Sequence, residues 1–137
     1  MRLNLWHAHP YAGDWPDKVA VAGKEFTNHK LAAKYGWVRL EGVYQTHPPY
    51  PRLDASAYIQ GTVTAPVKRT ATLRVGLDNW AIVYVNGQQV AMLDHADEFQ
   101  TVKIPVTLNE GDNRILIKTN NRQNRERHLW AMHCVVE

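Results

Sequence analysis

Residues 70–90 decide the fold, and they read TATLRVGLDNWAIVYVNGQQV. Apolar and polar residues alternate over Thr70–Val75, and a period of two predicts a strand that buries one face. Gly76–Asn79 interrupts this alternation with residues that are common in turns. The first part of the stretch therefore predicts a strand that ends in a loop.

The second part of the stretch predicts a hairpin. Trp80–Val85 contains only aromatic, β-branched and small apolar residues, as expected of a buried strand. Asn86-Gly87 follows, and this pair readily adopts the positive φ angles that both positions of a two-residue type I′ turn require. Gln88–Leu93 is then the expected partner strand.

Short strands recur along the rest of the chain. They are expected at Trp37–Tyr44, Ala55–Thr64, Phe99–Val106, Arg114–Thr119 and His128–Val136. Turn residues separate them about every ten residues and little helix is expected, which is typical of an antiparallel sandwich. Pro105 lacks the N–H that a central strand needs, so it suggests an edge strand or a bulge. We predict an all-β protein with an antiparallel β-sandwich.

The chain has 137 residues, of which 45% are hydrophobic, and this suffices for one domain with a sizeable core. We find no linker and no internal repeat. Residues 1–137 are therefore expected to form a single β-sandwich domain, with residues 1–35 as an irregular segment packed on it. Within that segment, Lys18–Ala22 can be a short strand or a loop.

Several classes of protein can be set aside. No apolar run approaches the roughly 20 residues of a membrane span, so no membrane partner is expected. Cys134 is the only cysteine, and its apolar surroundings predict a buried, inert thiol. The formal charge of +3 is mild and no nucleic-acid reader motif occurs, so nucleic acid is not the expected partner. The compartment cannot be read from these features.

Several motifs of the central and C-terminal part occur in a recognisable order. They are Leu73–Trp80, Val83–Gly87, Gly111–Lys118 and Leu129–Met132. Together they resemble a galactose-binding-like jelly-roll module of the kind that accompanies bacterial carbohydrate-active enzymes. The resemblance covers roughly Trp37 to Val136. It implies a jelly roll, an oligo- or polysaccharide ligand, a catalytic domain in the parent chain, and an extracellular or periplasmic location.

Sugar binding needs aromatic faces for the sugar rings and planar polar side chains for the hydroxyls. The chain offers five Trp and six Tyr, of which Trp80 and Trp130 are assigned mainly to the core. The basic residues can line a site for carboxylated or sulfated sugars, or form solvated faces. A solvated hairpin loop is likewise the alternative for residues 120–126. The expected ligand-binding residues are Trp15, Tyr50, Asn120, Asn121, Arg122, Asn124 and Arg125.

Metal sites have little support in the sequence. Asp78 and Asn79 could offer oxygen ligands to a structural Ca²⁺, but two such groups are too few, and Asx-turn capping of the loop is the alternative. His7 and His9 would share one face of a strand, yet no zinc-site spacing occurs. No other cofactor is expected.

These features favour a non-catalytic carbohydrate-binding module over an enzyme. The expected ligand is an acidic or plant or algal polysaccharide, and the expected parent is a larger polysaccharide-degrading enzyme. No Gly-x-Ser-x-Gly elbow occurs, and any choice of paired carboxylates would be arbitrary. A structural or interaction module without a ligand, and a small metal-dependent enzyme, are the alternatives.

Overall fold

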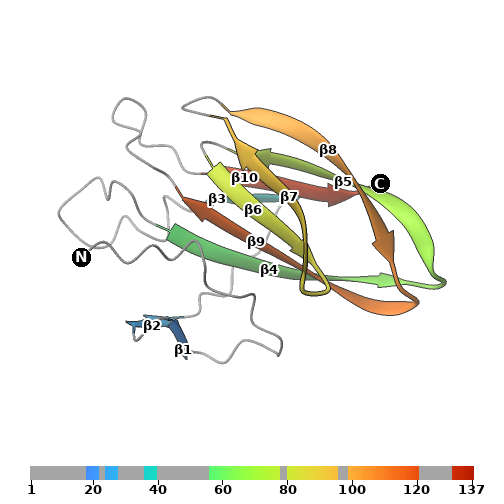
Figure 1. Cartoon of the computed structure of the whole chain (residues 1–137), viewed down its shortest axis with the longest axis horizontal. Coiled ribbons are helices and arrows are strands. Elements are labelled where there is room, and N and C mark those ends of the chain that lie inside the picture. The colour runs from blue at the N-terminus through green and yellow to red at the C-terminus, as the bar shows by residue number, and fades with distance from the viewer. Residues whose placement is uncertain are drawn as a thin grey trace.

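The computed structural model describes residues 18–21, 24–27, 36–39, 56–77, 80–95, 99–120 and 131–137. Nearly all of these residues lie in β-strands (Figure 1). No helix with the length and apolar character of a membrane span occurs in these ranges. The strands are β1 (Lys18–Val21), β2 (Lys24–Thr27), β3 (Trp37–Arg39), β4 (Ser56–Ala65), β5 (Arg69–Leu77), β6 (Trp80–Val85), β7 (Gln88–Asp94), β8 (Gln100–Leu108), β9 (Gly111–Asn120) and β10 (Ala131–Val136).

Two four-stranded antiparallel sheets form the sandwich, with the orders β3-β10-β5-β8 and β4-β9-β6-β7. Strands that follow one another mostly cross between the sheets, and this strand order is that of a jelly roll. The predicted β-sandwich is therefore confirmed. β1 and β2 pair as a separate two-stranded sheet, so Lys18–Val21 is a strand and not a loop.

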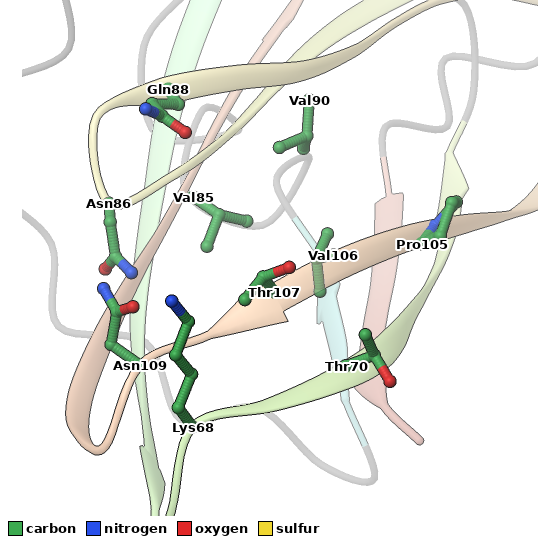
Figure 2. Close-up of a pocket in the computed structure, with 10 residues that line it drawn as sticks. All are labelled: Lys68, Thr70, Val85, Asn86, Gln88, Val90, Pro105, Val106, Thr107 and Asn109. Atoms are coloured by element: carbon green, nitrogen blue, oxygen red, sulfur yellow. The ribbon is translucent and has the colours of Figure 1, made fainter.

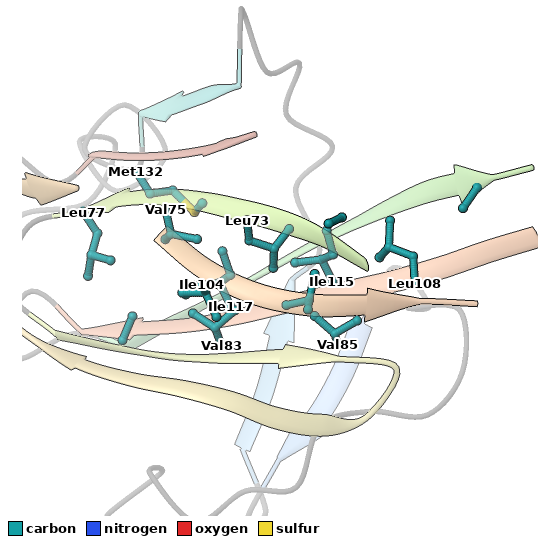
Figure 3. Close-up of a cluster of buried hydrophobic side chains, with 14 residues drawn as sticks. Leu73, Val75, Leu77, Val83, Val85, Ile104, Leu108, Ile115, Ile117 and Met132 are labelled. Carbon is teal, nitrogen blue, oxygen red and sulfur yellow. The ribbon is translucent and has the colours of Figure 1, made fainter. Parts of the chain in front are cut away.

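The core lies between the two sheets and follows the alternation seen in the sequence. In β5 the odd-numbered residues from Ala71 to Leu77 are buried, and in β8 the even-numbered residues from Ile104 to Leu108 are buried. β6 and β9 oppose them from the other sheet. Figure 3 shows the side chains of this cluster and labels Leu73, Val75, Leu77, Val83, Val85, Ile104, Leu108, Ile115, Ile117 and Met132.

The predicted Asn86-Gly87 turn is confirmed. These residues have φ angles of 50° and 82°, as a two-residue type I′ turn requires. β8 is an edge strand, which explains why Pro105 is tolerated in it. Several strand boundaries were predicted wrongly: β5 continues through Gly76 to Leu77, β8 continues to Leu108, and β9 runs from Gly111 to Asn120.

The outer face of the β4-β9-β6-β7 sheet carries a second apolar cluster. Ile82, Tyr84 and Leu116 are buried there, and Tyr58 and Trp80 pack against them. Trp80 thus belongs to this outer cluster and not to the core between the sheets. Lys118 is fully buried on the same face, with Nζ 5.5 Å from the centre of the Tyr58 ring. Burial lowers the pKa of Lys118 to about 8.

Close to the opposite end of β9, Asn113 acts as a fully buried hydrogen-bonding centre. Its Oδ1 accepts from Asn109 N at 2.8 Å and from Asn86 Nδ2 at 2.8 Å. Its Nδ2 donates to the carbonyl oxygens of Asn109 at 2.8 Å and Gly111 at 3.0 Å. One side chain therefore ties the β8–β9 turn to the β6–β7 hairpin.

We expect Asn113→Ala to lower the free energy of unfolding by about 3 kcal/mol, because it removes the four hydrogen bonds that this buried side chain makes to Asn86, Asn109 and Gly111. Urea denaturation measures this loss. Asn109→Ala is the matched control: it keeps the backbone groups that Asn113 binds and is expected to cost less than about 1 kcal/mol. Equal losses in the two variants would contradict the assigned role of Asn113.

Lys118→Met is expected to stabilise the protein at pH 7 by about 1–3 kcal/mol, because it removes a buried charge. The folded-state pKa of Lys118 is lowered from 10.5 to about 8, so the unfolded chain binds the proton more tightly. The free energy of unfolding of the wild-type protein therefore rises as the pH goes from 8 to 10.5. The stability difference between Lys118→Met and the wild type shrinks over the same range.

Urea denaturation from pH 7 to pH 10 measures that difference between variant and wild type. The raised pKa of Cys134, about 11, makes stability fall with pH above 9. This effect is the same in the variant and the wild type, so it cancels in the difference between them. Lys103→Met serves as a control because Lys103 is exposed. A constant difference across this range for Lys118→Met would refute the prediction.

Candidate functional site

The structure places one of the predicted ligand-binding residues. Asn120 is the last residue of β9 and is 2% exposed, although the sequence suggested that it lies in a loop. The others, Trp15, Tyr50, Asn121, Arg122, Asn124 and Arg125, lie outside the described residues, as do Asp78, Asn79, His7 and His9. In the part of the chain that can be inspected, no three His, Cys, Asp or Glu side chains group together as metal ligands.

The described residues on either side of residues 121–130 lie at one end of the sandwich. Asn120 pairs with Trp80 at the start of β6. Ala131 opens β10, and the next residue, Met132, pairs with Leu77 at the end of β5. We call this the β5–β6 end, and the end that carries the Asn86-Gly87 turn the hairpin end.

An exposed group of rings lies near the β5–β6 end, on the outer face of the β3-β10-β5-β8 sheet. One row of paired residues crosses the four strands there: Trp37, His133, Gly76 and Thr101. Trp37 is 45% exposed, and its ring centre lies 5.1 Å from that of His133. The neighbouring residues Val75 and Met132 point inward to the core, so this row points outward.

Phe99 completes the group from just before β8. Its ring stacks on Trp37, with ring centres 5.3 Å apart and planes inclined by 20°. A Cβ added to Gly76 would lie 2.7 Å from Phe99 Cζ, so the ring rests directly on the glycine backbone. This close approach explains why a glycine occurs inside β5. We call Trp37, Phe99 and His133 the aromatic platform.

Charged groups occupy the next row of the same face. Arg74 pairs with Lys103 across β5 and β8, one sheet row from the platform, at about 7 Å along the strands. Glu137 bridges them: its carboxylate oxygens lie 3.0 Å from Arg74 Nε and 3.9 Å from Lys103 Nζ. This row therefore contains two cationic side chains and one anionic side chain.

The platform has the chemistry of a stacking surface. The rings of Trp37 and Phe99 are large, 45% and 40% exposed, and held in position by each other and by Gly76. An aromatic pair of this kind presents rigid apolar area at little cost in conformational entropy. The sequence left Trp37 uncommitted and missed Phe99 and His133 as site residues. A glycine inside a strand often marks a close approach, but the sequence placed Gly76 in a loop, so it gave no such signal.

Beneath this face, Cys134 is half-buried and packs against the core. Burial raises the pKa of its thiol to about 11, so the thiol is protonated at neutral pH. The prediction that it is not a nucleophile agrees with this environment.

No protein-family model and no curated protein sequence matches the chain. Among solved structures, the chain is similar to part of a β-glucosidase from Kluyveromyces marxianus, with a TM-score of 0.57 and 10% identity. That match covers 82% of this chain and 14% of the β-glucosidase. The same enzyme in complex with glucose gives a TM-score of 0.53 and 10% identity over 93% and 15% of the two chains.

A family 35 carbohydrate binding module from an environmental isolate has 21% identity over 61% of this chain and 66% of that one. Its TM-score of 0.42 is too low to establish a shared fold. The β-glucosidase matches, at 10% identity, show a shared fold alone. This chain spans about one seventh of that enzyme, so the comparisons establish a β-sandwich that can occur as one part of a larger protein.

We expect Gly76→Ala to displace Phe99 from Trp37, because the new Cβ would also lie 2.9 Å from Thr101 Oγ1. The chain has only two Phe, so NMR of phenylalanine-labelled protein resolves the change at Phe99. The Trp37 ring shifts the NMR signal of Phe99 in the wild-type protein. In Gly76→Ala this signal should move towards the chemical shift of a phenylalanine that is not stacked.

Gly61→Ala is the matched control in another strand. Nothing lies within 4 Å of a Cβ added there, so it should leave the Phe99 signal in place. An unchanged Phe99 signal in Gly76→Ala would show that the ring does not depend on this glycine.

Proposed function

We propose that this protein is a non-catalytic carbohydrate-binding module and that the aromatic platform is its binding surface. One observation carries the proposal: Trp37 and Phe99 are stacked, exposed and supported by Gly76 on the outer face of a sheet. The faces of pyranose rings carry C–H groups, and stacking them on indole and phenyl rings removes apolar surface from water.

The surroundings of the platform favour an extended, acidic chain. The surface lies on a sheet face, so it suits the side of a polysaccharide more than a single sugar. Thr101 and His133 can meet hydroxyl groups, and the cationic side chains of Arg74 and Lys103 can meet carboxylates. A uronate-containing plant or algal polysaccharide combines these properties.

The fold supports a role within a larger enzyme. A sandwich of this kind forms about one seventh of a β-glucosidase that has been solved with glucose. We propose that this module likewise belongs to a carbohydrate-active, secreted enzyme, as the resemblance to galactose-binding-like modules implies. Further ligand contacts are proposed from the sequence for Trp15, Tyr50, Asn120, Asn121, Arg122, Asn124 and Arg125. Ca²⁺ at Asp78 and Asn79 would be structural.

A structural module without a ligand is the second candidate. The exposed rings of Trp37 and Phe99 also suit a protein surface, because aromatic residues are enriched at the centres of interfaces. In that case the rings would pack on the parent's catalytic domain.

Affinity electrophoresis in gels containing polygalacturonate or a neutral glucan tests the proposed function. The wild-type protein should be retarded, more strongly by the acidic polymer. Trp37→Ala and Phe99→Ala should each weaken retardation at least about tenfold, or about 1.4 kcal/mol. Gly76→Ala should also weaken it, although it removes no aromatic ring.

Met92→Ala is the matched control. Met92 is 64% exposed but lies on the other sheet, so its replacement should leave retardation unchanged. Lys103→Gln should reduce the preference for the acidic polymer and leave retardation by the glucan unchanged. No retardation of the wild-type protein in any polysaccharide gel would reject the proposal and favour the structural module.

A further inference from the structure

A pocket opens at the hairpin end, away from the aromatic platform. Its volume is about 530 Å³, within the range of pockets that hold small organic ligands. It lies between the β6–β7 hairpin and the edge strand β8, with the start of β5 below (Figure 2). Its lining comprises Lys68, Thr70, Val85, Asn86, Gln88, Val90, Pro105, Val106, Thr107 and Asn109.

The apolar part of the pocket comes from the core. Val85 and Val106 are buried core residues that reach the end of the sandwich here. β7 contains an irregularity at this point: Val83 pairs with Ala91 and Tyr84 with Gln89, which leaves Val90 as an extra residue. Val90 packs against the core and lines the pocket, so the bulge supplies an apolar wall.

The polar rim is held in place by Asn113. The side chain of Asn86 is fixed, since its Nδ2 donates to Asn113 Oδ1 at 2.8 Å and its Oδ1 accepts from Arg114 N at 2.9 Å. Asn109 is fixed through its backbone N and O by the same Asn113. The rim is therefore arranged before any ligand arrives, which lowers the entropic cost of binding.

The polar side chains that remain for a ligand are those of Lys68, Thr70, Gln88, Thr107 and Asn109. Within the described chain, none of these side chains makes a hydrogen bond or an ion pair. Figure 2 shows Lys68 extending towards Asn109 and Asn86. The described lining contains this one ammonium group and no carboxylate, so a ligand that carries one negative charge is favoured over a cation.

We propose that this pocket is a second binding site and that it takes a single sugar acid. Its carboxylate would bind Lys68, its hydroxyls would bind Gln88 and Thr107, and its C–H groups would lie on Val85 and Val90. The inference rests on the proposed function only in taking the ligand to be a sugar; its site and its residues are separate from the platform. A module with both sites would hold a polysaccharide along the sheet face and an acidic sugar residue at the hairpin end.

NMR titration of the ¹⁵N-labelled chain with glucuronate tests the proposal. Amide signals of residues 85–90 and 106–109 should shift, and glucose, its neutral counterpart, should bind at least about fivefold more weakly. Lys68→Gln should remove that preference, whereas Lys103→Gln, which neutralises an exposed lysine near the platform, should keep it. Phe99→Ala should weaken retardation by polysaccharide and leave the glucuronate shifts unchanged.

Several outcomes would overturn this inference. Acetate or sulfate that shifts the same signals as strongly as glucuronate would reduce the site to a general anion site. Glucuronate shifts confined to residues 36–37 and 99–101 would assign the sugar acid to the platform. No shift with any of these ligands, while polysaccharide is still bound, would reject the pocket as a site and leave the proposed function intact.

Discussion

The burial of one face of each sheet against the other is the constraint on which this structure depends. A strand points successive side chains to opposite sides, so the residues that fill the core also decide which residues face outward. Leu73, Val75 and Leu77 of β5 fill the space between the sheets. Arg74 and Gly76 must then lie on the outer face, and with them the charged row and the glycine that supports Phe99.

The two outer faces of the sandwich have become different surfaces. One carries Ile82, Tyr84 and Leu116, which are buried, together with a fully buried Lys118. The other leaves Trp37 and Phe99 accessible beside an exposed ion-pair row. A stacking ligand can reach large aromatic faces on the second of these surfaces, and we place the proposed carbohydrate site there.

Small departures from regular sheet structure occur beside both candidate sites. Gly76 has no side chain, which lets the Phe99 ring approach the backbone of β5. The bulge in β7 turns Val90 towards the hairpin pocket, and Asn113 replaces missing backbone partners at the adjacent turn. Local irregularities of this kind are expected where a fold positions groups for binding.

The sequence by itself determined most strands of the sandwich, the hairpin and the class of fold, because alternation and the Asn86-Gly87 turn are local properties. The sequence also indicated, from Pro105, that the strand containing this residue lies at the edge of a sheet. The tertiary structure decided what those patterns could not. Trp37, Phe99 and His133 are far apart in the sequence and meet because β3 and β10 pair beside β5. Strand order depends on long-range packing, so no local pattern could show that Gly76 lies inside a strand beneath an aromatic ring.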